Sequence, residues 1–362
     1  MDERTLKDSI NTFDIIIPAY KPGESFLRLL QMLKVQERPF SKLIIINTVP
    51  DGVAAGYVNT DNAVKDNNSY DAGQDNKAYN GNKSDDLDRT LEIIKQVFED
   101  SSLYIYKCIK QSEFDHAGTR KAAAALSEAD AFICMTDDAV PDDKYLTSKL
   151  IDALETDEKT AIAYGRQLPR EGAGAIERYT REFNYPARDS VKTIDDIDRL
   201  GIKTFFASNV CCAYKKRIYN ELGGFTDTAI FNEDMLYAAK ALKNGYISRY
   251  VSAARVIHSH SYTAMQQLHR NFDLGMSQAM NPEVFNGIAS EGEGIKLVKN
   301  TAAWLIKNHA AKELPELIIS SGFKYIGFRL GKAYRKIPDR AMLFLAMNKS
   351  YAKKIIKQRR NG

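Results

Sequence analysis

The adjacent carboxylates at Asp137 and Asp138 are the part of this sequence most suited to chemistry. They follow the apolar run Ala131–Met135, which is typical of a buried strand, and the carboxyl ends of parallel strands are where open α/β sheets bind ligands. Two neighbouring acids attract a hard divalent cation, which in turn attracts a diphosphate. The alternative is a helix cap, but Asp142 or Asp143 could equally cap the helix that follows. The sequence therefore favours a metal site over a cap.

A second chemical group precedes the alanine-rich segment 117–129, which we expect to be helical. Asp115, His116 and Arg120 bring a carboxylate, an imidazole and a guanidinium to the start of that helix, where an anion is favoured. Alternatively, Asp115 only caps the helix and Arg120 lies on a solvated face. No glycine-rich phosphate loop accompanies these residues, so both interpretations stay open.

Two further groups are better explained by structure when each is taken alone. Glu233 and Asp234 open an expected helix, and acids in a first turn complement the helix dipole by about 0.3–1 kcal/mol. A carboxylate there could instead act as a general base that accepts a proton from a substrate hydroxyl. His258 and His260 end an expected strand, whose alternation points both imidazoles to one face, where they could join a metal or diphosphate site.

Strand and helix patterns alternate through the first part of the chain and must position these groups. The runs 13–17 and 43–46 are compact, β-branched and typical of buried strands, and the apolar spacing within 26–33 predicts a helix between them. These elements form a βαβ unit with a right-handed crossover. The alternation continues to about residue 164, so we expect an α/β fold with a mostly parallel, Rossmann-like sheet and helices on both faces.

Two polar stretches and a helical end complete the organisation. Residues 56–88 are rich in Asn, Asp, Gly and Lys, which predicts a long loop or insertion. Residues 166–203 are charged and irregular, as expected of a connection that covers a substrate. Residues 205–214 are expected to form another strand, and the sequence after His260 predicts helices connected by polar segments.

Composition narrows the class of protein. The chain has 362 residues, 44% of them hydrophobic and 27% charged, which is ordinary for a soluble globular protein. No run approaches the roughly 18 apolar residues of a membrane span, and the N-terminus lacks an apolar signal core. The four cysteines lack metal-ligand spacing and are expected to be reduced core residues of a cytosolic protein: Cys108, Cys134, Cys211 and Cys212.

The net charge of +4 is unevenly distributed. Residues 317–362 contain twelve Lys and Arg against one acid, so this tail carries +11 and the remaining chain −7. Because aromatic and aliphatic residues are interleaved with the basic ones, the tail suits an anionic membrane surface. A solvated helical face is the alternative. Nucleic acid is not expected as a partner, because no nucleic-acid-binding motif accompanies the charge.

The order of these groups resembles the inverting family 2 glycosyltransferases of the GT-A fold, over about residues 12–280, and within them the rhamnosyltransferase-like branch. In that branch a strand end similar to 135–141 replaces the more usual acid-x-acid motif. The segments that carry the resemblance are Pro18-Ala19-Tyr20, Phe114–Arg120, Met135–Pro141, Phe206–Asn209, Asn232-Glu233-Asp234 and His258–Tyr262.

The resemblance implies a role for each residue. Asp138 matches a metal-binding acid that holds Mg²⁺ or Mn²⁺ against the donor diphosphate, with His260 as a further ligand. Asp234 matches the catalytic base, with Glu233 beside it. The expected donor-binding residues are Pro18, Ala19, Tyr20, Asn47, Asp115, Arg120 and Asp137, and the expected acceptor-side residues are Ser208, Asn209 and His258.

Two positions depart from the family pattern. Thr136 stands where the first acid of the acid-x-acid motif is usual, so a weaker or differently assembled metal site is expected. Asn47 opens the segment 47–52, which replaces the acid that usually reads the nucleobase, so the family pattern does not fix the base.

The resemblance implies a metal-dependent inverting glycosyltransferase with a catalytic domain at 1–280 and a basic helical extension at 281–362. The expected donor is dTDP-rhamnose, then a UDP-sugar, and the expected acceptor is a saccharide or a lipid-linked saccharide of a bacterial surface polysaccharide. The expected location is the cytoplasm or the inner face of the cell membrane, and a homo-oligomer stays open.

Two other functions are weighed against this one. A nucleotidyltransferase shares the sheet and the acidic metal site, but it would normally carry a glycine-rich basic loop where only Lys21-Pro22-Gly23 stands. A non-catalytic subunit that binds sugar nucleotides is the other alternative, and the intact Asp138 and Asp234 argue against it.

Overall fold

The computed structural model describes residues 9–52, 57–58, 85–287 and 291–361. The polar loop or insertion expected at 56–88 lies outside the described residues, except for the short strand β3 (Tyr57–Val58) and the start of helix α2 (Asp85–Val97).

The N-terminal half of the sheet is parallel, apart from the short strand β3, which pairs antiparallel with β4 (Tyr104–Lys110). Strands β1 (Phe13–Ala19), β2 (Leu43–Val49), β4 and β5 (Ala131–Met135) lie in the order β4-β2-β1-β5. Helix α1 (Glu24–Lys34) connects β1 to β2 and completes the predicted βαβ unit. Three of these strands, β1, β2 and β5, are almost entirely buried, which explains their continuous apolar runs.

The second half of the sheet is mixed. Strand β9 (Cys211–Lys215) runs antiparallel to both β5 and β7 (Thr160–Leu168), while β10 (Ile247–Ile257) runs parallel to β7. Short strands β6 (Val140–Pro141) and β8 (Ser190–Lys192) pair antiparallel with β10. The α/β sheet with helices on both faces is confirmed, but it is parallel only in part. Strand β9 starts at the end of the sheet where β7 finishes, so the chain returns antiparallel to β7 instead of crossing to its other end.

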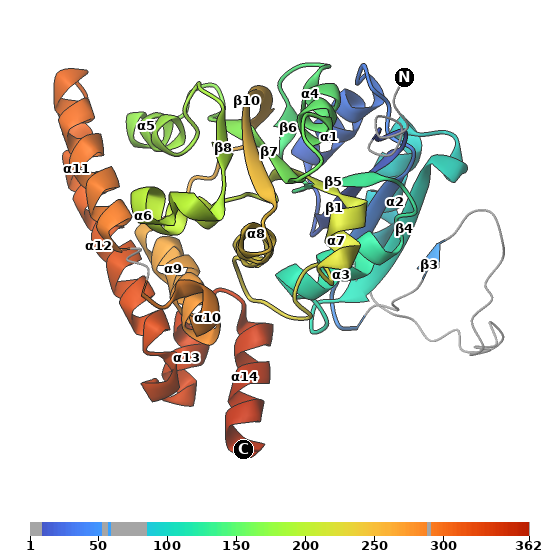
Figure 1. The fold of residues 1–362 in the computed structure, drawn as a ribbon. Helices are drawn as coiled ribbons and strands as arrows, with labels where there is room; N and C mark the ends of the chain where they lie inside the picture. The colour runs from blue at the N-terminus through green and yellow to red at the C-terminus, as the bar shows by residue number, and fades with distance from the viewer. Residues whose placement is uncertain (1–8, 53–56, 59–84, 288–290, 362) are drawn as a thin grey trace.

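Helices cover both faces of the sheet (Figure 1). One face packs against α1, α2 and α4 (Leu146–Glu155), and the other against α3 (His116–Ala125), α7 (Lys216–Glu221) and α8 (Glu233–Lys243). Alternation along β1 divides the two cores, because Ile15 and Ile17 belong to one and Ile16 to the other. The four cysteines are buried and free, as predicted.

The stretch expected to be an irregular connection contains regular structure. Helix α5 (Ala175–Asn184), strand β8 and helix α6 (Ile197–Leu200) lie within 166–203. The strand expected at 205–214 is shorter than predicted, because a 3-10 helix, Gly201–Phe205, precedes the extended residues of β9.

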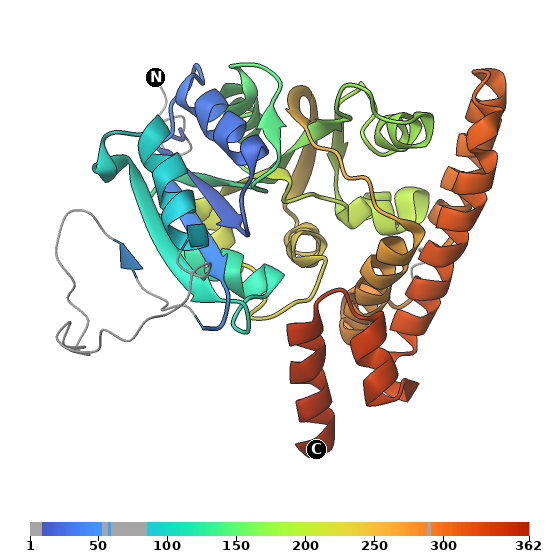
Figure 2. The same ribbon diagram turned by 180° about the vertical axis from the view of Figure 1, so that it is seen from behind.

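The last third of the chain is helical, as predicted. It comprises α9 (Ala264–Met280), α10 (Pro282–Phe285), α11 (Glu291–Lys307), α12 (Leu314–Lys332), α13 (Asp339–Leu345) and α14 (Lys349–Asn361). Helices α11 and α12 lie along the outer edge farthest from β1, β2 and β4, as both views show (Figures 1 and 2). Within the described residues, no helix is long and apolar enough to cross a membrane.

Helix α12 is packed closely on α9. A Cβ atom at Gly327 would lie 2.2 Å from the carbonyl oxygen of Leu268, and one at Gly331 would lie 2.1 Å from that of Phe272. Only glycine permits such a close backbone approach. The division at residue 280 stays a prediction, but α13 and α14 share a core with α9 and with the segment before α8.

Candidate active site

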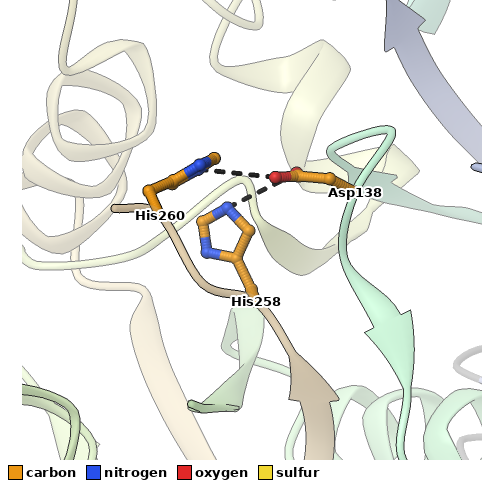
Figure 3. A group of neighbouring side chains, drawn as sticks. All are labelled: Asp138, His258 and His260. Carbon is orange, nitrogen blue, oxygen red and sulfur yellow. Dashed lines mark ion pairs between the residues drawn. The ribbon is translucent and has the colours of Figure 1, made fainter. Parts of the chain in front are cut away.

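A carboxylate and two imidazoles converge where β5 and β10 end (Figure 3). The Nε2 atom of His258 lies 3.4 Å from Oδ1 of Asp138, and Nε2 of His260 lies 3.4 Å from Oδ2. Burial would raise the pKa of Asp138, but the hydrogen bond and charge of His258 and the charge of His260 lower it to about 2. Asp138 is therefore ionised, and its two oxygens and the two Nε2 atoms face one another as potential ligands.

The neighbouring acid has a different environment. Oδ2 of Asp137 accepts a hydrogen bond of 3.0 Å from the backbone N–H of Tyr20, which ties the end of β5 to the end of β1. Burial raises the pKa of Asp137 to about 6, with the nearby charge of Asp138 adding to the effect. Pro18 and Ala19 lie in β1 just before this contact, while the ring of Tyr20 is exposed. The donor-binding role of these four residues stays a prediction.

Asp234 lies in the first turn of α8. Its Oδ2 accepts a hydrogen bond of 3.0 Å from the backbone N–H of Asn209, and its Oδ1 accepts one of 2.8 Å from that of Met235. Burial and, to a smaller extent, the charge of Glu233 raise the pKa of Asp234 to about 7. Asn232, the residue before α8, has a φ of 65°, a left-handed conformation that non-glycine residues adopt mainly where the surrounding structure imposes it.

Glu233 and Arg120 form a buried ion pair. The guanidinium of Arg120 lies 3.1 Å from Oε1 of Glu233, and both side chains are about 5% exposed. Burial would raise the pKa of Glu233, but Arg120 and His116 lower it. We expected Glu233 in catalysis and Arg120 at the donor. Both roles stay predictions, although the structure commits the two charges to each other.

Asn209 holds both acids of α8 in place. Its backbone N–H binds Asp234, and its side-chain amide donates a hydrogen bond of 3.0 Å to Oε1 of Glu233. The hydroxyl of Tyr214 donates to Oδ1 of Asn209 at 2.7 Å. Asn209 is buried with these contacts, and its expected place on the acceptor side stays a prediction.

Two expected donor-binding residues are buried with local partners. Oδ1 of Asp115 accepts a hydrogen bond of 2.6 Å from Gly118 N–H. Asp115 therefore caps α3, as the alternative interpretation of the sequence expected. The amide of Asn47 donates to the hydroxyl of Tyr106 at 2.8 Å, and its Oδ1 has no hydrogen-bond partner among the described residues. Donor contact by either residue stays a prediction.

A polar network that the sequence analysis missed lies beside the histidines. Gln167, at the end of β7, contacts Nδ1 of His258, the guanidinium of Arg181 and the hydroxyls of Tyr185 and Ser208. His258, expected on the acceptor side, therefore lies between this network and Asp138, whereas Ser208 lies at its far end. The missed signal was a glutamine near the end of an apolar strand run.

A cavity of about 480 Å³ lies elsewhere, near the C-terminal end of α8. Its walls include Lys121, Lys240 and Lys243, and no residue of the expected site lines it. Lys240 and Lys243 donate to backbone carbonyls there, and Lys121 pairs with Asp227. The chemistry therefore concentrates at the strand ends and not in this cavity.

Comparisons with known proteins give the family. Residues 84–223 match glycosyl transferase family 2. Over 247 residues, 67% of this chain and 77% of the relative, the chain is 38% identical to the O-antigen chain rhamnosyltransferase WbaN of Salmonella anatum. It is 37% identical over the same lengths to RfbN of Salmonella typhimurium, which has the same description. A solved mannosyltransferase from Pyrobaculum calidifontis, in complex with GDP-Man and Mn²⁺, is similar over 98% of this chain and 91% of its own, at 12% identity and a TM-score of 0.47. The chain belongs to glycosyl transferase family 2, in its rhamnosyltransferase-like branch, and is a glycosyltransferase.

Proposed function

We propose that this glycosyltransferase moves rhamnose from dTDP-rhamnose to a saccharide acceptor, free or lipid-linked, with inversion at the anomeric carbon, during synthesis of a bacterial surface polysaccharide. The observation that carries the proposal is the similarity over two thirds of the chain to two O-antigen chain rhamnosyltransferases. Family membership favours glycosyl transfer over the nucleotidyltransferase alternative.

Asp234 is the proposed general base. Its carboxylate is half-buried and its pKa is raised to about 7 by burial and by Glu233, so it can accept a proton near neutral pH. The acceptor O–H gives its proton to Asp234 as its oxygen bonds to the anomeric carbon. The bond from that carbon to the diphosphate breaks on the opposite face, and the electron pair leaves with the diphosphate. Attack opposite the leaving group inverts the anomeric configuration.

Asp138, His258 and His260 fit a divalent cation. Their ligand atoms all lie within 4.8 Å of one another, and the gaps of 3.4 Å between carboxylate and imidazoles are longer than good hydrogen bonds. A bound cation would neutralise charge on the departing diphosphate. Two imidazoles beside one carboxylate favour Mn²⁺ over Mg²⁺, which prefers oxygen ligands.

The test is transfer from a panel of sugar nucleotides to a lipid-linked acceptor, followed by proton NMR of the new linkage. We expect turnover with dTDP-rhamnose above UDP-sugars, inverted configuration in the product, and loss of activity with a chelator that Mn²⁺ restores. Retained configuration would contradict the base assignment. Absence of both transfer and slow donor hydrolysis across the panel would favour the non-catalytic alternative.

We also propose that α11 and α12 contact an anionic membrane surface. Of the apolar residues in the basic tail, Tyr334 and Met342 are buried, whereas Tyr325 is exposed. Six apolar residues of α11 and α12 are each at least half exposed: Ile295, Ile306, Ile318, Ile319, Tyr325 and Ile326. Exposed basic residues flank them on α11, namely Lys296, Lys299 and Lys307. Shallow apolar insertion beside positive charge suits an anionic leaflet.

Flotation with anionic and neutral liposomes tests this contact. Ile318→Glu with Ile319→Glu should release the protein from anionic liposomes at low salt, while Val35→Glu, at an exposed apolar residue of the N-terminal half, should not. Point changes are preferable to removing residues 324–362, because that truncation would uncover the face of α9 on which Gly327 and Gly331 pack. Wild-type protein that never floats, or that self-associates through this face, would contradict the proposal.

A further inference from the structure

Gln167 is almost completely buried beside the proposed metal site. Both the oxygen and the nitrogen of its side-chain amide have hydrogen-bond partners. Its Oε1 accepts from the guanidinium of Arg181 and lies 3.0 Å from Nδ1 of His258. Its Nε2 donates to the hydroxyl of Tyr185 and, at 2.9 Å, to Oγ of Ser208. No part of the proposed transfer reaction uses this amide.

The partners fix which way the amide points. A guanidinium can only donate hydrogen bonds, so the amide atom that faces Arg181 must be the oxygen. The amide nitrogen then faces two hydroxyls, both of which can accept. Exchanging the two ends would set donor against donor at Arg181. The orientation therefore follows from chemistry and not from the placement of the atoms alone.

A fixed carbonyl favours one tautomer of His258. Two groups face Nδ1 of His258: Oε1 of Gln167 at 3.0 Å, which can only accept, and the guanidinium of Arg181 at 3.5 Å, which can only donate. The shorter contact, to Gln167, favours a proton on Nδ1. In the neutral ring the lone pair then lies on Nε2, the atom that faces Asp138 at 3.4 Å. That is the form in which an imidazole binds a cation through Nε2.

We propose that Gln167 is a positioning residue of the metal site, which holds His258 as the Nδ1–H tautomer so that Nε2 is available to the ion. The inference rests on the metal part of the proposed function. The proposal also assigns a role to Arg181, because the charge of Arg181 keeps the amide oxygen of Gln167 turned toward the imidazole of His258.

Two substitutions separate positioning from packing. Gln167→Glu keeps an acceptor oxygen toward His258 and Arg181 but loses both donated hydrogen bonds, whereas Gln167→Leu loses all of them. Mn²⁺ affinity, measured by calorimetry without nucleotide, should fall about 10–100-fold in Gln167→Leu and stay within a few-fold of wild type in Gln167→Glu. Gln36→Leu, at another buried glutamine with several partners, should leave it unchanged.

The tautomer itself gives a second readout. Long-range proton–nitrogen NMR of protein labelled at its five histidines should find the His258 proton on Nδ1 in wild type and in Gln167→Glu. In Gln167→Leu it should be shared with Nε2. A wild-type proton on Nε2, unchanged Mn²⁺ affinity in Gln167→Leu, or equal losses in both variants would overturn the proposal. Wild type that binds no Mn²⁺ would instead contradict the metal part of the proposed function. If Gln167→Leu fails to fold, the wild-type tautomer and Gln167→Glu still decide.

Discussion

The site contains two pairs of adjacent acids, and in each pair the pKa of one member is lowered while that of the other is raised. In the first pair Asp138 has a pKa lowered to about 2 beside two histidines, while Asp137 has a pKa raised to about 6 by burial. In the second pair Glu233 has a lowered pKa beside Arg120, and Asp234 a pKa raised to about 7 by burial and by Glu233. Neighbours with separated pKa values indicate separate tasks.

The useful member differs between the two pairs. A metal ligand must be ionised at all working pH values, which suits the low-pKa acid, Asp138. A general base works best with a pKa near the working pH, which suits the high-pKa acid, Asp234. We expect Asp137 and Glu233 to act as supports, because one binds the backbone of Tyr20 and the other pairs with Arg120.

The largest expected effect comes from breaking the second pair at its base. Asp234→Asn should lower kcat about 10²–10⁴-fold and leave donor affinity unchanged, because the amide cannot accept the acceptor proton. Steady-state kinetics and donor calorimetry check this. Asp227→Asn, at an exposed acid paired with Lys121, is the control and should keep full activity. Near-complete turnover in Asp234→Asn would move the base elsewhere.

In the second pair, we expect Glu233 to contribute to the free energy of unfolding. Glu233→Gln leaves the charge of Arg120 buried without a counter-charge, and breaking a buried pair in this way typically costs about 3–5 kcal/mol in free energy of unfolding. Urea denaturation measures the loss. An unchanged midpoint would mean that Arg120 finds another partner or water in the folded protein.

In the first pair, we expect substitutions of Asp138 and Asp137 to differ in their effect on metal affinity. Asp138→Asn removes an ionised ligand of the proposed site. Losing a residue that only supports a metal ligand typically lowers metal affinity about 10–100-fold, so we expect the Mn²⁺ affinity of Asp138→Asn to fall by at least that much. Asp137→Asn should have a smaller effect, because Asp137 binds the backbone of Tyr20. Calorimetry on both variants decides, and a larger loss in Asp137→Asn would reverse the assignment.

The smallest expected effect is a shift in pH dependence. The base must be ionised to act, so kcat/KM should rise with pH through about 7, not through the range near 4 where an ordinary aspartate titrates. Because the charge of Glu233 helps to raise this pKa, Glu233→Gln should move the acid limb of the profile to lower pH. A limb that does not move would show that Glu233 does not tune the base.

Sequence patterns predicted the parallel half of the fold better than the mixed half. The β-branched runs of β1 and β2 identify buried strands with a helix between them. The apolar run of β9 identifies a strand but not its direction, since a buried strand has the same composition in either direction. The basic charge of the last helices was visible, but the face that α12 turns outward depends on its glycine contacts with α9.

The candidate site was predicted in the same uneven way. Asp138, Asp234, His258 and His260 stand at strand ends or a helix start, where chemistry is expected, and the structure brings Asp138 together with both histidines. The pairing of Arg120 with Glu233 joins residues far apart in the chain and depends on how α3 packs near α8. Single-residue patterns hold no information on such a contact.

The central claim is that one acid holds the metal and donor while the other performs transfer. Calorimetry of dTDP binding with and without Mn²⁺, paired with single-turnover transfer, tests it on Asp138→Asn and Asp234→Asn together. The account predicts that Asp138→Asn loses the Mn²⁺-dependent part of dTDP binding, and that Asp234→Asn binds dTDP like wild type but does not transfer the sugar. Mn²⁺-dependent binding that survives in Asp138→Asn, or transfer that survives in Asp234→Asn, would contradict it.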